Sequence, residues 1–235
     1  LFPASVAKGM TQAETQVFKS EGIWPIVVND VFIPEFFRPE LIQIWYGGSG
    51  SGKSDAKATE LLLKAIVQPY FRCLFTRKHR EHVRDSQFLL FKDLIERYGL
   101  KRFFRIKESE MDFICTTNGN MLLSGGLDDV DKLKSIADIT DIWIEEPINR
   151  KESVHLSDFT ELVRRLRSDK ASLHLHLTFN PISKATWIYS LLFKVDTYKS
   201  RAIKTTYRDN YFRPPGEDEK YEALKTIDYN EWNIY

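Results

Sequence analysis

The residues best suited to chemistry form one short run, Gly47-Gly48-Ser49-Gly50-Ser51-Gly52-Lys53-Ser54. Its spacing is G-x-x-x-x-G-K-[ST], in which glycines let successive main-chain N–H groups turn toward phosphate oxygens. In such a loop Lys53 reaches the β- and γ-phosphates, and the Ser54 hydroxyl is a ligand for Mg²⁺. The run therefore predicts a site for ATP and Mg²⁺; the alternative is a flexible linker of glycine and serine.

Two acids follow the apolar segment Ile142-Trp143-Ile144, as a nucleoside triphosphatase would need. Glu145 is expected to hold Mg²⁺ through its water shell, because Glu reaches further than the more usual Asp. Glu146 is expected to polarise the attacking water. The alternative is an exposed strand end that carries two solvated carboxylates.

Thr178 and Asn180 end a further apolar segment. Strand carboxyl ends line the ligand crevice of an α/β sheet, so either residue could sense the γ-phosphate or position water. Ordinary turn chemistry is the alternative, since Asn-Pro favours turns.

The apolar pattern alternates between strand and helix periods after residue 40, which predicts an α/β fold with a mostly parallel sheet. Strands are expected at 41–46, 71–76, 103–106, 111–116, 121–124, 139–145, 172–179 and 201–206, and helices at 54–68, 79–98, 157–167, 185–193 and 217–226. Asn118-Gly119 predicts a hairpin, so one edge of the sheet should be mixed. With the phosphate loop, this predicts a P-loop NTPase of the ASCE type, a three-layer sandwich with a hairpin insertion. We expect 1–40 to wrap the core irregularly, 41–210 to form the ATPase core and 211–235 to be a C-terminal helix and linker.

Composition excludes several classes of protein. The 235 residues are 43% hydrophobic and 29% charged, which excludes general disorder, and no apolar run approaches a membrane span. The 34 basic and 33 acidic residues give no overall charge that would favour nucleic acid. Cys73 and Cys115 lie in apolar segments and are expected to be buried, reduced thiols of a cytosolic protein. Residues 1–10 do not resemble a signal peptide.

Taken in order, the motifs resemble the ATPase domain of the large terminase subunit of tailed bacteriophages, over residues 44–210. They are Tyr46 to Ser54, Thr76-Arg77-Lys78, Arg84-Asp85-Ser86, Gly126-Leu127-Asp128-Asp129, Lys132 to Ile136, Ile142 to Glu146, Arg165-Leu166-Arg167, Thr178 to Pro181 and Thr205 to Asn210. Only the phosphate loop is a specific motif when taken alone. The full set of motifs in this order is far more specific than any one of them.

The resemblance implies a motor that hydrolyses ATP to drive viral double-stranded DNA into a procapsid in the cytoplasm of an infected bacterium. Its implied partners are the portal protein, the small terminase subunit and further copies in a ring, although the isolated domain could be monomeric. Thr178 and Asn180 match the family's coupling motif. The family's nuclease domain would begin about where this chain ends, and no acidic cluster is left over for nuclease chemistry.

The sequence departs from the family's pattern at one loop position that affects the charge near the γ-phosphate. The family commonly has Arg four residues before the loop lysine, where this chain has Ser49. The compensating cation is then expected elsewhere, including a neighbouring subunit, with Arg77, Arg165 and Arg167 as candidates and Lys134 as a weaker one. Each could instead be a solvated or salt-bridged surface cation.

Two further segments have open interpretations. The basic stretch Arg72, Arg77, Lys78, His79, Arg80, His82 and Arg84 could contact DNA phosphates or begin a solvated helix. Phe32, Phe36, Phe37 and Tyr46 could lie near the adenine, although core packing is the more frequent role. Two other functions remain compatible with the loop: a P-loop kinase, and a nucleotide-gated scaffold without turnover.

Overall fold

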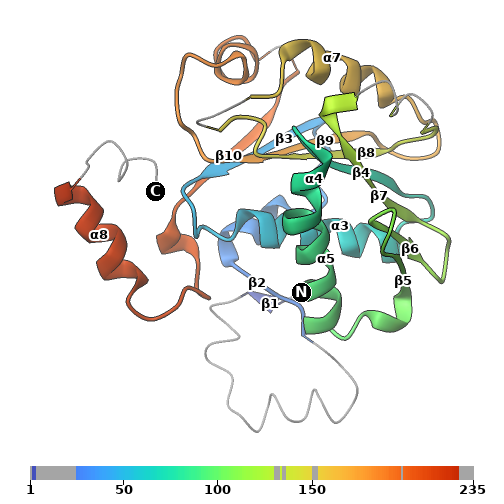
Figure 1. Ribbon diagram of the computed structural model, residues 1–235, viewed down its shortest axis with the longest axis horizontal. Helices are drawn as coiled ribbons and strands as arrows, with labels where there is room; N and C mark the ends of the chain where they lie inside the picture. The colour runs from blue at the N-terminus through green and yellow to red at the C-terminus, as the bar shows by residue number, and fades with distance from the viewer. Residues whose placement is uncertain are drawn as a thin grey trace, which may run out of the picture.

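A computed structural model describes residues 2–3, 25–129, 133, 136–149, 153–196 and 198–227. Its centre is an eight-stranded sheet with the order β10-β3-β9-β8-β4-β7-β6-β5 (Figure 1). Six strands run parallel: β3 (Ile42–Gly47), β4 (Arg72–Arg77), β7 (Met121–Gly126), β8 (Asp141–Glu145), β9 (His174–Phe179) and β10 (Arg201–Thr205).

The hairpin lies at one edge of the sheet, as the sequence predicts. β5 (Phe104–Lys107) and β6 (Asp112–Cys115) pair antiparallel, and β6 pairs antiparallel with β7. In the turn between β6 and β7, Gly119 has a φ of +77°. A separate parallel pair is formed by β1 (Phe2–Pro3) and β2 (Val27–Val28).

Helices cover both faces of the sheet, which makes three layers (Figure 1). On one face lie α3 (Lys53–Val67) and a nearly continuous helix made of α4 (Arg80–Val83), the π-helical segment Arg84–Phe88 and α5 (Leu89–Arg97). The other face carries α7 (Leu156–Arg165) and the π-helical segment Tyr189–Lys194. α8 (Glu217–Ile227) lies beyond the β10 edge.

The alternation of side chains along the strands divides the core between the two faces. On β4, Cys73 and Phe75 pack with α3 and α5, whereas Leu74 packs with the α7 layer. On β8, Trp143 faces α5 and its apolar neighbours face α7. Cys73 and Cys115 are buried and neither forms a disulfide. Among the described residues, no helix is long and apolar enough to cross a membrane.

A buried layer of charge, which apolar periodicity does not reveal, fixes α3 to the sheet. Lys57 Nζ lies 2.5 Å from a carboxylate oxygen of Glu60, and Lys64 Nζ lies 2.6 Å from Asp141 Oδ1. His176 links the two pairs, because its Nδ1 is 3.2 Å from Lys57 Nζ and its Nε2 is 3.0 Å from Asp141 Oδ1. Removing one member would leave its partner charged and unpaired in the interior, which is strongly destabilising.

Short 3₁₀ turns complete the described chain: Asp30–Glu35, Lys101–Phe103, Leu127–Asp129 and Tyr207–Asp209. The expected helix at 185–193 is the main difference from the sequence prediction, because its regular part is the π-helical segment Tyr189–Lys194. Of the predicted N-terminal wrapping segment, residues 4–24 lie outside the described chain. The described remainder packs on the core, where Phe32 stacks on Trp45 at 4.8 Å between ring centroids.

Candidate nucleotide-binding and hydrolysis site

The sheet order brings the predicted chemical groups into one row. β3 ends in the phosphate loop, and its neighbour β9 carries Thr178 near its end and is followed by Asn180. β8 comes next and ends at Glu145, and β4 follows and ends at Arg77. Because these four strands are parallel and adjacent, their carboxyl ends meet along one edge of the sheet. Segments far apart in the sequence therefore converge on the loop.

The phosphate loop turns directly into α3 and leaves the start of that helix open. Gly52 precedes the first helical residue, Lys53, and no side chain caps the main-chain N–H groups there. Gly50 and Gly52 have φ angles of +77° and +80°, which side-chain-bearing residues rarely adopt. A helix N-terminus with free N–H groups attracts anions. The local backbone thus suits phosphate groups.

Lys53 is held inside the loop. Its ammonium donates to Gly48 O at 3.1 Å and to Asn180 Oδ1 at 2.7 Å. The side chain is 8% exposed, and burial lowers the pKa of Lys53 to about 8, although the carboxylates of Glu145 and Glu146 act in the opposite direction. The contact with Asn180 links the loop to the end of β9, where the sequence predicts the coupling motif.

Glu145 and Ser54 form the candidate position for Mg²⁺. Burial raises the pKa of Glu145, while a hydrogen bond from Ser54 and the charge of Arg77 act to lower it. Glu145 Oε2 is buried without a hydrogen-bond partner, which leaves one carboxylate oxygen available. A hydroxyl and a carboxylate are oxygen ligands of the kind that Mg²⁺ takes together with substrate phosphates and waters. These two residues therefore fit the ion in a shared site with a nucleotide.

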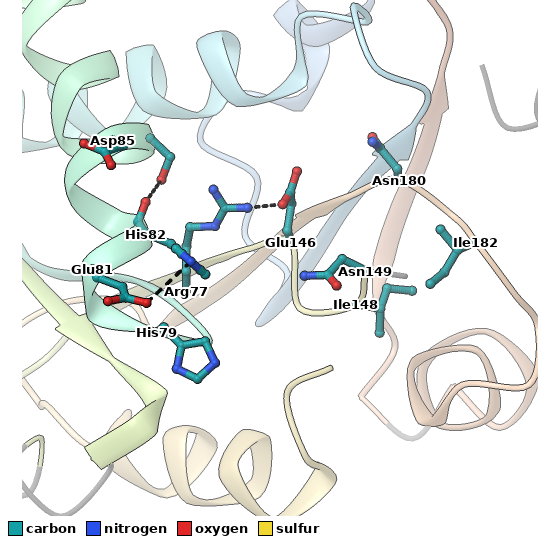
Figure 2. Close-up of a pocket in the computed structure, with 11 residues that line it drawn as sticks. Arg77, His79, Glu81, His82, Asp85, Glu146, Ile148, Asn149, Asn180 and Ile182 are labelled. Carbon is teal, nitrogen blue, oxygen red and sulfur yellow. Dashed lines mark hydrogen bonds and ion pairs between the residues drawn. The ribbon is translucent and has the colours of Figure 1, made fainter. Parts of the chain in front are cut away.

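Glu146 follows directly in an unusual backbone conformation. Its φ is +49°, in the left-handed region that costs a non-glycine residue about 1 kcal/mol or more. Its main-chain N–H donates to Thr178 O at 2.8 Å, which anchors this turn to β9. The carboxylate accepts a hydrogen bond from the Arg77 guanidinium and is 42% exposed (Figure 2). Glu146 therefore lies between the phosphate loop and the end of β4.

Two cavities meet at Glu146. The first, the phosphate-loop cavity, has a volume of about 220 Å³ and is lined by Ser49 to Asp55, Glu146, Thr178 and Asn180. The second, the Arg77 cavity, has a volume of about 760 Å³ and includes Arg77, His79, His82, Asp85, Glu146 and Asn180 (Figure 2). Glu146 and Asn180 line both cavities, so they separate the loop from the larger space.

Thr178 is fully buried and is bonded to both neighbouring elements of the site. Its hydroxyl accepts a hydrogen bond from Trp143 Nε1 at 2.8 Å, across the β8–β9 pair. Its carbonyl accepts the Glu146 N–H described above. Thr178 thus helps to hold the Glu146 turn, whereas Asn180 contacts the loop itself.

The other arginines predicted from sequence lie away from the loop. Arg165 is on α7, where its guanidinium pairs with Glu161 one helical turn earlier. Arg167 is exposed just after that helix. Neither lines the phosphate-loop cavity, and none of the described residues that line it is an arginine. Lys134 lies outside the described residues.

The basic stretch predicted from sequence begins at the first residue of β4 and continues past α4, and its arginines have different partners. Arg72 is half-buried and donates to Ala137 O, and Arg77 is paired with Glu146. Arg80 and Arg84 are exposed and donate to the carbonyls of Glu110 and Glu108. DNA contact by this segment therefore stays a prediction.

The aromatic residues near the loop pack in the core. Phe32 and Phe36 stack on Trp45, and Tyr46 stacks on Phe179 at 6.2 Å between centroids. Phe37 is 46% exposed. None of the four lines the phosphate-loop cavity, so core packing is the interpretation that fits Phe32, Phe36 and Tyr46.

Two asparagines that contact the loop region were not assigned a role from sequence. Asn210 donates from Nδ2 to Gly50 O at 2.8 Å, and Asn29 donates from Nδ2 to Asn210 Oδ1 at 3.1 Å. Asn210 lies in the Thr205–Asn210 motif. That motif contributed to the family resemblance, but it indicated no role for Asn210 itself. Asn29 has no pattern around it that could have indicated this contact.

The phosphate loop after β3, the acids at the end of β8 and the strand β9 between them define the class of protein. This is the fold of a P-loop nucleoside triphosphatase of the ASCE type, with a mostly parallel sheet between two helical layers. Residues 39–235 match the sequence profile described as "Phage terminase large subunit". The chain therefore belongs to the phage terminase large subunit family.

Known proteins of this family resemble the chain in sequence and in fold. It is 30% identical over 211 residues to the PBSX phage terminase large subunit of Bacillus subtilis strain 168, covering 82% of this chain and 47% of that protein. The large terminase of a thermophilic bacteriophage, solved in complex with ADP, superposes with a TM-score of 0.64 at 17% identity, over 79% of this chain and 45% of that one. The large terminase ATPase domain of Thermus phage P74-26 gives a TM-score of 0.64 at 12% identity, over 96% of each chain. The chain spans about half the length of the curated relatives it matches.

Proposed function

We propose that this chain is an ATP-hydrolysing motor domain that powers the packaging of viral double-stranded DNA. The observation that carries the proposal is the shared cavity of Lys53 and Glu146: a buried ammonium lies in a phosphate-type loop, and the acid directly after β8, two strands along the sheet, lines the same space. Membership of the terminase family supplies the biological setting, and the large terminase of the thermophilic bacteriophage, in its ADP complex, shares the fold.

Each residue then has a stated task. The N–H groups of the loop and of the first turn of α3 bind phosphate oxygens, and Lys53 neutralises charge on the β- and γ-phosphates. Ser54 and Glu145 hold the oxygen-ligand position for Mg²⁺, which supplies further neutralisation of phosphate charge when bound. Glu146 accepts a proton from water as general base. Thr178 and Asn180 link this region to β9.

The cation at the γ-phosphate is proposed to come from Arg77 or from a neighbouring copy through Arg165 or Arg167. Arg77 already contacts Glu146, which lines the loop cavity, so its guanidinium lies beside the site. Arg165 and Arg167 do not line the loop cavity of their own chain, so for them only a role in a second copy is consistent with the fold. An isolated chain would then turn over slowly.

The partners proposed for the assembled protein are double-stranded DNA, the portal protein, the small terminase subunit and further copies of this chain in a ring. The setting is the cytoplasm of an infected bacterium. These follow from the family alone, and the chain spans about half of the related proteins. A translocating motor is expected to grip backbone phosphates rather than read bases.

The experiment is a phosphate-release assay on the 235-residue chain with ATP, with and without Mg²⁺ and DNA. Lys53→Ala should abolish nucleotide binding, and Glu146→Gln should lower the rate about a hundredfold or more while binding persists. Glu96→Gln is the matched control, because Glu96 is an exposed acid on α5 that pairs with Lys101. Activity should rise with protein concentration if a second copy supplies the cation.

Retention of turnover in both site variants would refute the mechanism. Transfer of the γ-phosphate to an acceptor other than water would favour a kinase. Tight ATP binding without phosphate release, in the presence of DNA and at high protein concentration, would favour a nucleotide-gated scaffold.

A further inference from the structure

Two side-chain amides lie on the outer side of the phosphate loop and come from opposite ends of the chain. Asn29 precedes the 3₁₀ turn Asp30–Glu35, and Asn210 follows the turn after β10. Asn210 Nδ2 donates to Gly50 O at 2.8 Å. Asn29 Nδ2 donates to Asn210 Oδ1 at 3.1 Å. Through this amide pair, segments near the two ends of the described chain reach the loop.

The orientation of both amides is fixed by main-chain donors. The N–H of Phe212 donates to Asn210 Oδ1 at 3.0 Å, and the N–H of Tyr211 donates to Asn29 Oδ1 at 2.8 Å. A main-chain N–H cannot accept a hydrogen bond, so each of these contacts identifies the oxygen of the amide. The Nδ2 group of Asn210 must therefore face Gly50.

The contact with Gly50 determines the direction of the next N–H group in the loop. A trans peptide is planar, so the carbonyl of Gly50 and the N–H of Ser51 point to opposite sides. Anchoring the Gly50 carbonyl to Asn210 on the outer side therefore aims the Ser51 N–H toward the inner side of the loop. A phosphate-binding nest needs successive N–H groups aimed inward.

The left-handed glycines of the loop are packed closely against the same outer layer. A Cβ on Gly52 would lie 2.6 Å from Asn29 Nδ2, and a Cβ on Gly50 would lie 2.7 Å from the Tyr221 hydroxyl of α8. A side chain at either position would have to displace the neighbouring Asn29 or Tyr221 side chain. The loop is thus supported from outside by Asn29, Asn210 and Tyr221.

We propose that Asn210, oriented by Asn29, is a positioning residue that sets the inward direction of the Ser51 N–H and so tightens the binding of phosphate groups. The inference rests on the proposed nucleotide site and adds a residue to it. Asn29 and Asn210 also line a cavity of about 590 Å³ on the outer side of the loop, so direct contact with a base is the competing role. Comparing phosphate ligands with and without a nucleoside distinguishes the positioning role from direct contact with a base.

The experiment compares Asn210→Asp with the unaltered chain. Aspartate can still accept from Asn29 and Phe212, but it cannot donate to Gly50 O. Dissociation constants are measured with Mg²⁺ for ATPγS and for inorganic tripolyphosphate, together with the melting temperature without ligand. Asn210→Asp should weaken both ligands by about tenfold or more, because it loses the hydrogen bond to Gly50 O and adds a negative charge near the phosphates. Asn29→Ala adds no charge, so a smaller loss of affinity for both ligands in this variant reports the orientation of Asn210 alone, and its absence would overturn the positioning role.

Asn118→Asp is the matched control. Asn118 also donates its amide to main-chain carbonyls, including Ala65 O at 3.0 Å, but at the far end of α3. It should lower the melting temperature and leave both dissociation constants unchanged. Unchanged affinity in Asn210→Asp, an equal loss in Asn118→Asp, or a loss confined to ATPγS would each overturn the positioning role. Failure of the unaltered chain to bind either ligand would instead refute the proposed function.

Discussion

Raising the pH above 8 provides a test of the role of Lys53 that does not depend on turnover. Burial lowers the pKa of Lys53 to about 8, so the empty site loses its ammonium in a range where an exposed lysine stays charged. Phosphate oxygens around Nζ would favour the charged form. Nucleotide binding should therefore take up a proton above pH 8, and affinity should fall as the pH rises through that value.

The size of the effect follows from this pKa. If the ammonium stays charged in the complex, the dissociation constant should rise relative to pH 7 by about tenfold at pH 9 and about thirtyfold at pH 9.5. The latter corresponds to about 2 kcal/mol. Proton uptake should be about half a proton per nucleotide at pH 8.

The assay is calorimetric titration with ATPγS in two buffers that differ in ionisation enthalpy, from pH 7 to pH 9.5. Lys53→Arg is the control, because a guanidinium stays charged over this range and its affinity should not vary with pH. The role of Lys53 would be refuted if the affinity of the unaltered chain for ATPγS did not change with pH, or if the affinity of Lys53→Arg fell by the same factor. Either result would show that the Lys53 ammonium does not bind the phosphates.

Three further predictions concern other residues. Arg77→Ala should lower kcat about a hundredfold with little change in the KM for ATP, because it removes a cation beside Glu146; a kcat equal to that of the unaltered chain would count against Arg77. Ser54→Ala should raise the Mg²⁺ concentration needed for half-maximal hydrolysis several-fold, which a metal titration would measure, because it removes one proposed ligand. Acid should destabilise the fold through His176: burial, followed by the charge of Lys57, lowers its pKa to about 3, so below pH 6.5 only the unfolded chain takes up that proton. Lowering the pH from 7 to 5 should decrease the free energy of unfolding, measured with urea, by about 2 kcal/mol. The His176→Asn variant should lack this part of the decrease.

Much of the fold could be predicted from local patterns. The strands that became β3, β4, β8 and β9 are apolar runs bounded by turn residues, and the helix after the loop has the apolar spacing of α3. The region 185–193 was less predictable. Its apolar content indicated a helix, but the choice of π-helical hydrogen bonding at Tyr189–Lys194 depends on packing that a sequence window does not contain.

The candidate site likewise has parts that local sequence patterns predict and parts that depend on packing. The phosphate loop can be recognised in the sequence because its glycines and lysine are contiguous, and the acids at 145–146 follow an obvious strand. The contact between Lys53 and Asn180 joins residues 127 positions apart and exists because β9 pairs with β3. The positive φ of Glu146 and its pairing with Arg77 likewise depend on the order β9-β8-β4.

The sequence by itself determined the class of chemistry, because a phosphate loop is a local backbone device whose glycines, lysine and serine must be neighbours in the chain. It also determined most elements, since helix and strand periods are local. Only the tertiary structure decided that Glu146 and Asn180 line the loop cavity, that Asn210 bonds to the loop from outside, and that Arg77 pairs with Glu146. Strand order is settled by burial and pairing between distant segments, and the buried charges of Lys57, Lys64 and Asp141 leave no periodic signal because each is tolerated only opposite its partner.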